Sequence, residues 1–198
     1  MASESEGPGL SKEKILSAFA RLNDHLADNQ IIGELCLFGG TAMLPGFNAR
    51  PSTRDVDAIF QPAAMIREFA KRVAEEQELP LHWLNDVVKG FQSEHPEITS
   101  ESLPQYSHLR IYRPTAEYLL AMKCLAARAT GPETLGDKAD ILTLIRRLKF
   151  QTVEEVTANL IRFFPPNRIP AKAQFMIHEA SFEIKDPAAS GGEFTRRD

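Results

Sequence analysis

The sequence has little cysteine and no recognisable metal-binding pattern of histidines. Its 198 residues include two cysteines, Cys36 and Cys124, each within an apolar stretch. Two isolated cysteines do not form the disulfide framework of a small secreted domain, so we expect both to be core residues in a reducing compartment. The five histidines share no zinc-ligand spacing, and we assign no zinc site.

The sequence also lacks long apolar runs and a strong excess of positive charge. No apolar run approaches the length of a membrane-spanning helix, and the acidic start MASESEGPGL lacks the apolar segment of a signal peptide. We therefore expect a cytoplasmic protein without a membrane partner. The net charge of −4 argues against a general polyanion binder. Residues 1–100 hold 9 basic and 15 acidic residues, whereas residues 101–198 hold 14 and 12, so only the second half is slightly basic.

The alternation of helical and strand patterns predicts an α/β (α+β) fold. We expect residues 11–113 to form a mixed sheet flanked by helices. Residues 114–185 have only helical patterns, and we expect a helical part that completes a cleft shared with the first half. Residues 1–10 and 186–198 are polar and contain glycine and proline, which predicts a disordered lead and tail.

Local signals predict individual elements. Ser11 is a suitable N-cap for the first helix, and Thr152 with Glu155 can form the capping box of a later helix. Two segments have weaker patterns. Residues 79–91 are ambiguous and could hold a short strand, whereas residues 95–104 are polar and indicate a loop.

A pair of glycines follows the first predicted strand. The run Leu35–Phe38 is typical of a buried strand, and Gly39 and Gly40 come directly after it, before a short helix that begins at Thr41. Adjacent glycines let the backbone approach a ligand closely, and a helix that starts after them directs free N–H groups toward an anion. The segment is a candidate phosphate site, although a glycine pair alone is most often only a turn.

Two aspartates separated by one residue begin the next predicted strand, residues 55–60. Side chains two apart on a strand point the same way, so Asp55 and Asp57 present two carboxylates side by side. Such carboxylates repel each other unless a divalent cation lies between them, and Mg²⁺ or Mn²⁺ suits oxygen ligands of this kind. A phosphate site beside a metal site is what phosphoryl or nucleotidyl transfer requires.

Together, the glycine and aspartate motifs resemble the signature of the nucleotidyltransferase superfamily that includes DNA polymerase beta. The signature stands here as Gly39-Gly40-Thr41 and Asp55-Val56-Asp57. The resemblance implies that the glycine motif grips the triphosphate of a nucleotide and that the two acids bind Mg²⁺ and act in catalysis. It also implies a third acid on a following strand, for which Asp86 is the candidate by its order along the chain.

Further motifs resemble the bacterial AbiEii-type nucleotidyltransferases, many of which are toxins of toxin–antitoxin systems. In chain order they are Arg50, Thr53 and Arg54, then Tyr118-Leu119-Leu120-Ala121-Met122-Lys123, then Arg128, and finally Asp137, Asp140 and Ile141. The resemblance covers residues 35–145. It implies that Arg54 and Lys123 contact nucleotide phosphates, and that Asp140 or Asp137 is a catalytic or supporting group.

Each of these residues also has a purely structural interpretation. Lys123 can extend its aliphatic chain along an apolar surface, and Arg54 can pair with the neighbouring aspartates. Asp137 can cap the following helix because it comes directly after Gly136. Asp140 lies one turn inside that helix, which favours it over Asp137 as a site residue.

The sequence therefore predicts a Mg²⁺-dependent nucleotidyltransferase. It would move NMP from an NTP to RNA, for example tRNA, or to a protein, and a cognate antitoxin is a further expected partner. Two other hypotheses remain open. A non-catalytic module of the same fold would act through a partner, and a kinase-type phosphotransferase would move the γ-phosphate instead.

Overall fold

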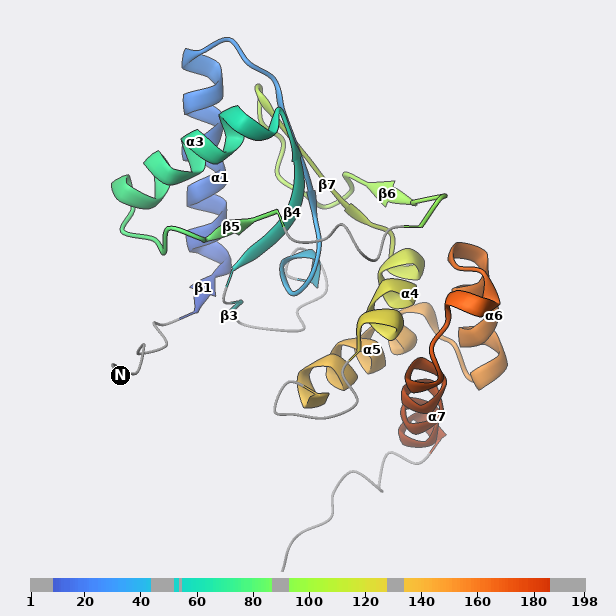
Figure 1. The fold of residues 1–198 in the computed structure, drawn as a ribbon. Coiled ribbons are helices and arrows are strands. Elements are labelled where there is room, and N and C mark those ends of the chain that lie inside the picture. Colours follow the sequence, from blue (N-terminus) through green and yellow to red (C-terminus); the bar gives the residue numbers. More distant parts are fainter. Residues whose placement is uncertain (1–8, 44–51, 54, 87–92, 128–133, 186–198) are drawn as a thin grey trace, which may run out of the picture. The chain divides into compact units, whose positions relative to one another are not determined.

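The computed structural model describes residues 9–43, 52–53, 55–86, 93–127 and 134–185 (Figure 1). The chain divides into two compact units. Unit 1 is Met1–Gln92 with Glu97–Thr115, and unit 2 is Ser93–Pro96 with Ala116–Asp198. The change of unit at Thr115 lies two residues after the boundary expected from the sequence. Apart from residues 9 and 10, the expected lead and tail lie outside the described residues.

Unit 1 is built on a five-stranded mixed sheet in the order β5-β4-β2-β7-β6. Its strands are β2 (Gly33–Leu37), β4 (Val56–Gln61), β5 (Leu84–Asn85), β6 (Ile98–Thr99) and β7 (Leu109–Pro114). Strand β2 lies in the centre, antiparallel to β4 and parallel to β7. Strand β5 runs parallel to β4, and β6 runs antiparallel to β7. The predicted mixed α/β class is confirmed.

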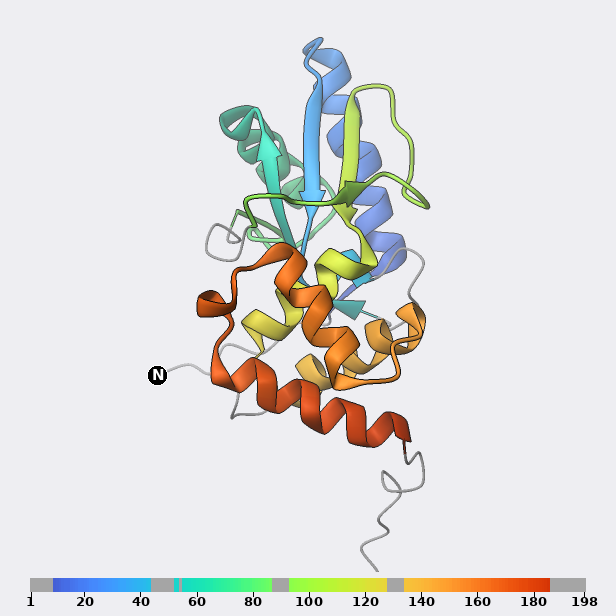
Figure 2. The same ribbon diagram turned by 90° about the vertical axis from the view of Figure 1, so that its right-hand side faces the viewer.

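Two helices cover one face of this sheet, α1 (Lys12–Asp28) and α3 (Ala63–Glu76) (Figures 1 and 2). Alternate strand residues, among them Leu35, Val56 and Ile111, share one buried cluster with apolar residues of both helices. Because side chains alternate along a strand, the residues between them point to the other face of the sheet. Asp57, between the buried residues Val56 and Ala58, is therefore on the face opposite the helices.

A two-stranded sheet joins the start of α1 to the segment before Asp55. Its strands, β1 (Leu10–Ser11) and β3 (Ser52–Thr53), are antiparallel. Ser11 is also the N-cap of α1, because its Oγ accepts a hydrogen bond from the backbone N–H of Lys14 at 3.3 Å. The predicted N-cap is confirmed, whereas the sequence pattern gave no indication of either short strand.

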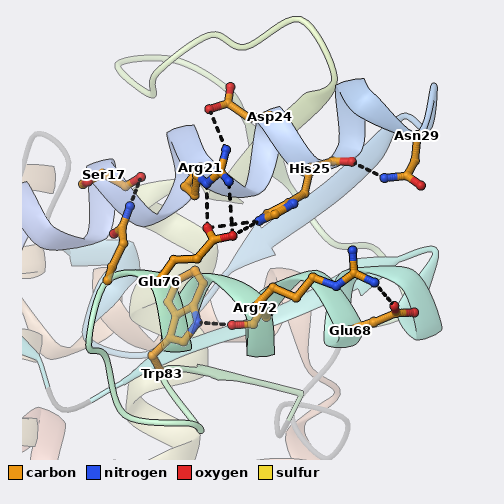
Figure 3. A network of polar contacts seen from close by, with 11 residues as sticks. Ser17, Arg21, Asp24, His25, Asn29, Glu68, Arg72, Glu76 and Trp83 are labelled. Atoms are coloured by element: carbon orange, nitrogen blue, oxygen red, sulfur yellow. Dashed lines mark hydrogen bonds and ion pairs between the residues drawn. The ribbon is translucent and has the colours of Figure 1, made fainter.

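A polar network joins α1 to α3 on the outside of this helical layer (Figure 3). Arg21 donates from Nε and Nη2 to the two carboxylate oxygens of Glu76, at 2.6 and 3.1 Å. His25 Nε2 lies 3.1 Å from Glu76 Oε1, and the His25 ring stacks on Phe69 with 5.7 Å between ring centroids. One carboxylate of α3 is thus shared by two side chains of α1.

We expect the replacement of Glu76 by glutamine to weaken the pH dependence of unfolding in acid. The hydrogen bond from Arg21 is the main cause that lowers the pKa of Glu76 below its ordinary value of 4.5. A carboxylate with a lowered pKa stabilises the fold above its unfolded pKa, and this contribution is lost as the pH falls through the folded value. The Tm difference between wild type and E76Q should be largest near neutral pH and shrink below pH 4.5.

The control for this experiment is E75Q, which removes the same charge from an exposed position on the same helix. Its Tm difference from wild type should depend less on pH than that of E76Q. Melting curves recorded from pH 7 to pH 3 would contradict the assignment if the Tm difference of E76Q stayed constant throughout.

Unit 2 contains four α-helices in its described part, α4 (Ala116–Ala126), α5 (Thr134–Leu148), α6 (Val153–Phe163) and α7 (Ala171–Lys185). Seven of the eleven residues of α4 are buried, as expected for a helix that contacts each of the other three. Tyr118 of α4 packs against the ring of Phe163 with 5.0 Å between centroids. Thr152 and Glu155 form the capping box that the sequence predicted for α6.

The two cysteines differ in burial. Cys124 is fully buried in α4, Cys36 is partly buried in β2, and neither forms a disulfide. Burial raises the pKa of each thiol to about 12. Since the thiolate is the reactive form, neither cysteine is a candidate nucleophile near neutral pH. Among the described residues, the structure contains no helix with the length and apolar character of a membrane span.

Three sequence predictions need correction. Asp55 precedes β4, which begins at Val56, so only Asp57 of the pair lies on the strand. The segment 95–104, expected to be a loop, contains the short strand β6. Asp137 is inside α5, which begins at Thr134, so it does not cap that helix. The first and third errors are shifts of boundary, whereas the second is a missed element.

Candidate functional site

The glycine motif forms a tight turn between β2 and a single 3₁₀ turn, Thr41–Met43. Gly39 has a φ of +57°, in the left-handed region that glycine adopts without steric cost. The N–H of Phe38 donates to the carbonyl of Asp57 at 2.7 Å, which fixes the start of the turn beside β4. The N–H of Ala42 donates to the carbonyl of Phe38 at 3.1 Å and closes it.

The side chain of Asp57 lies directly against this turn. A Cβ atom placed on Gly39 would be 2.5 Å from Asp57 Oδ2, closer than real Cβ contacts. The glycine is therefore needed twice, for its backbone conformation and for the approach of the carboxylate. The structure thus brings together one residue of the glycine motif and one of the aspartate motif.

Asp55 is held by its backbone and by its side chain. Its carbonyl oxygen accepts hydrogen bonds from Thr41 Oγ1 and from Thr53 Oγ1, each at 3.1 Å. Its carboxylate Oδ2 accepts a hydrogen bond from Asn85 Nδ2 at 2.6 Å. Thr41 is almost completely buried, so its hydroxyl holds the backbone of Asp55 in place within unit 1.

Strand β5 places Asn85, and not Asp86, beside the aspartates. In the parallel pairing of β4 with β5, Asn85 is the direct partner of Asp57. Asp86 follows it, and its Oδ2 lies 2.5 Å from Nη2 of Arg67 on α3. The Arg67 guanidinium also lies over the Phe60 ring, 5.6 Å from its centroid. The candidate third acid is thus engaged with the helical layer, and the polar group that reaches Asp55 is an amide.

The candidate ligands for a divalent cation are carboxylates. Asp55 and Asp57 offer carboxylate oxygens, and the missing Cβ of Gly39 lets the Asp57 carboxylate lie on the turn. No group of three or more His, Cys, Asp or Glu residues is placed to share a metal ion in the described part of the chain. Mg²⁺ often takes one or two carboxylates together with substrate phosphates, so these two residues would hold it with a nucleotide.

We expect the replacement of Gly39 by alanine to disturb both stability and the site. A residue with a Cβ costs about 1–2 kcal/mol in the left-handed region, and its methyl group must displace the Asp57 carboxylate. Urea unfolding should show this loss of stability. Gly40 is the matched control, because its φ is not positive and the nearest described atoms to a Cβ there are Oγ1 and Cβ of Thr53, at 3.0 and 3.6 Å. If G40A were as destabilised as G39A, the conformational argument would be wrong.

In unit 2, the structure brings together Lys123 and Asp140. Lys123 Nζ of α4 lies 2.7 Å from Asp140 Oδ2 of α5, and the two side chains are 14% and 1% exposed. The lysine is therefore engaged in a largely buried ion pair, and Asp140 in the same pair lies deeper. Asp137 is half-buried in the first turn of α5, where a carboxylate is favourable to the helix dipole.

The remaining residues of the resemblance are arginines. Arg50, Arg54 and Arg128 lie outside the described residues, so the expected phosphate contact of Arg54 stays a prediction. Sequence reasoning named Thr53 only as part of the resemblance, and it missed Asn85, which donates to the Asp55 carboxylate. The position of Asn85 directly before Asp86 could have pointed to it. Side chains of successive residues in extended backbone point to opposite faces, so Asn85 and Asp86 cannot both point toward Asp57.

Comparison of the chain with models of protein families found no match, and neither did comparisons with curated proteins and with solved structures. The functional argument therefore depends on the residues of the candidate site and on their geometry.

Proposed function

We propose that the protein is a Mg²⁺-dependent nucleotidyltransferase that moves NMP from an NTP to an acceptor hydroxyl and releases pyrophosphate. The observation that carries the proposal is the contact between the glycine turn and Asp57, with 2.5 Å between Asp57 Oδ2 and the position of a Cβ on Gly39. A turn suited to phosphate groups and a carboxylate suited to a cation thereby occupy one end of the sheet.

The residues of the candidate site have different proposed roles. Gly39, Gly40 and Thr41 would bind the triphosphate through the backbone of the turn, where the two glycines carry no side chain. Asp55 and Asp57 would hold Mg²⁺, which neutralises phosphate charge when bound. The hydrogen bonds from the Thr41 and Thr53 hydroxyls to the Asp55 carbonyl keep the Asp55 carboxylate in position. Positioning and charge neutralisation supply most of the catalysis in this kind of reaction.

The transfer needs no reactant besides the NTP and the acceptor. The acceptor oxygen forms a bond to the α-phosphorus, the bond from that phosphorus to the bridging oxygen breaks, and pyrophosphate leaves. The acceptor proton passes to a base, for which the aspartate carboxylates are the candidates. The resemblance to AbiEii-type proteins points to RNA, such as tRNA, or a protein side chain as acceptor, and to a toxin controlled by an antitoxin.

Labelled NTPs test the proposal. The protein is incubated with each α-³²P-labelled NTP, Mg²⁺, and either total RNA or cell protein. We expect label in one acceptor fraction, release of pyrophosphate and complete loss of transfer with EDTA. Transfer of label from a γ-labelled NTP to an acceptor, with release of NDP, would identify a kinase-type phosphotransferase instead. An absence of transferred label with every NTP and both acceptor fractions would overturn the proposal.

One observation favours the alternative of a non-catalytic module of the same fold. The polar group at the direct partner position of Asp57 is the amide of Asn85, where a third carboxylate would strengthen the case for catalysis. Such a module would act by binding a partner. Calorimetry separates the two, because NTP–Mg²⁺ binding that is lost in Asp55→Ala favours the enzyme, whereas an absence of NTP binding favours the module.

A further inference from the structure

Asn85 has a defined role in the electrostatics of the aspartate pair. Its Nδ2 lies 2.6 Å from Asp55 Oδ2, which is a short distance for an N–H···O bond. An ionised carboxylate only accepts hydrogen bonds, so the amide must present its NH₂ group to Asp55. Asn85 therefore orients Asp55 and offsets part of its negative charge without adding a negative charge of its own.

The register of the sheet places Asn85 next to both aspartates of the candidate cation site. Asn85 is paired with Asp57 across β4 and β5, and it contacts Asp55, so it lies beside both carboxylates. An aspartate at residue 85 would bring a third carboxylate to the pair. The carboxylate of Asp86, the next residue, contacts Arg67 on α3.

Resting on the proposed function, we propose that Asn85 is a positioning residue that makes cation binding depend on the nucleotide. The amide N–H of Asn85 competes with a free divalent cation for the Asp55 carboxylate, which weakens binding of the cation alone. The phosphates of a nucleoside triphosphate supply the missing oxygen ligands. The protein accordingly takes its cation together with the triphosphate.

Mn²⁺ binding followed by electron paramagnetic resonance tests this without any measurement of activity. The wild-type protein should bind free Mn²⁺ weakly, and at least about tenfold more tightly when a non-hydrolysable ATP analogue is present. N85D should bind free Mn²⁺ at least about tenfold more tightly than wild type, because carboxylates are the stronger ligands. D86N, which removes a carboxylate at the adjacent position, should leave the affinity for free Mn²⁺ unchanged.

The outcomes separate the two proposals. If wild type and N85D bind free Mn²⁺ equally well, the role of Asn85 is wrong, whereas the nucleotidyltransferase proposal stands as long as the analogue still binds. If wild type binds neither the analogue nor Mn²⁺ in its presence, the proposed function itself fails. Should N85D not give a cooperative melting curve, N85A replaces it. N85A removes the N–H that competes with the cation for Asp55, so it should bind free Mn²⁺ more tightly than wild type, and an unchanged affinity for free Mn²⁺ would overturn the role.

Discussion

Replacement of Asp57 by asparagine is expected to reduce nucleotidyl transfer by about 10³-fold or more, the scale of losing one preorganised electrostatic group. Asparagine keeps the size of the side chain and its place on β4, but removes the negative charge beside the glycine turn. The carbonyl of residue 57 still accepts the hydrogen bond from Phe38, so the turn itself should persist. Steady-state transfer rates with labelled NTP measure the effect.

The fold should survive the same substitution. We expect the Tm of D57N to lie within about 3 °C of wild type, as for most substitutions outside the core. D28N is the matched control, because it makes the same chemical change at an exposed position at the end of α1 and should leave the transfer rate unchanged. Full transfer activity in D57N would remove Asp57 from the site and, with it, the main support for the proposed reaction.

Replacement of Lys123 by methionine is expected to destabilise unit 2 by about 3 kcal/mol, the usual cost of removing one partner from a buried ion pair. Methionine fills similar space, so the loss reflects the charge interaction between Lys123 and Asp140, whose side chain is 1% exposed. Urea unfolding followed by circular dichroism measures the change. If K123M also lost nucleotidyl transfer, its lower stability would be a sufficient explanation, without a contact between Lys123 and a nucleotide phosphate.

Two further variants separate charge from packing. In the double variant K123M/D140L both charges are absent, and most of the lost stability should return. Lys138 of α5 is the control, because its Nζ lies 3.6 Å from Glu179 Oε2 and these side chains are 23% and 41% exposed. K138M should cost less than about 1 kcal/mol, as exposed pairs do. A K123M variant as stable as K138M would show that the Lys123–Asp140 pair contributes no more than a surface contact.

Signals contained within a few residues were sufficient to predict much of the fold. Ser11 and Thr152 cap their helices as expected, because a cap depends on a side chain and a backbone group three residues away. Strand β6 was missed because two residues are too short to show an alternating pattern. It forms through its pairing with β7, in which Ile98 faces Pro114 from a distant part of the chain.

In the candidate site too, local spacing indicated some residues, whereas others depend on distant parts of the chain. The two-residue spacing predicts side-by-side carboxylates only if both aspartates lie on the strand, and Asp55 lies just outside it. The hydrogen bond from Asn85 to Asp55 joins residues 30 positions apart, and it depends on the parallel register of β5. No local pattern in the sequence encodes that register. The contact of Asp86 with Arg67 likewise depends on how β5 and α3 pack, which order along the chain does not show.

The inclusion of Ser93–Pro96 in unit 2 has a consequence for attempts to dissect the protein. Residues of unit 1 both precede and follow this segment, so the polypeptide crosses between the units three times. Ser93 donates from its N–H to Tyr118 Oη at 2.9 Å and from Oγ to the carbonyl of Phe163 at 2.7 Å. A chain truncated after Thr115 would leave both donors without these acceptors, and a fragment from Ala116 onward would lack the serine. Neither unit is a contiguous gene segment, and a single cut cannot yield two intact halves.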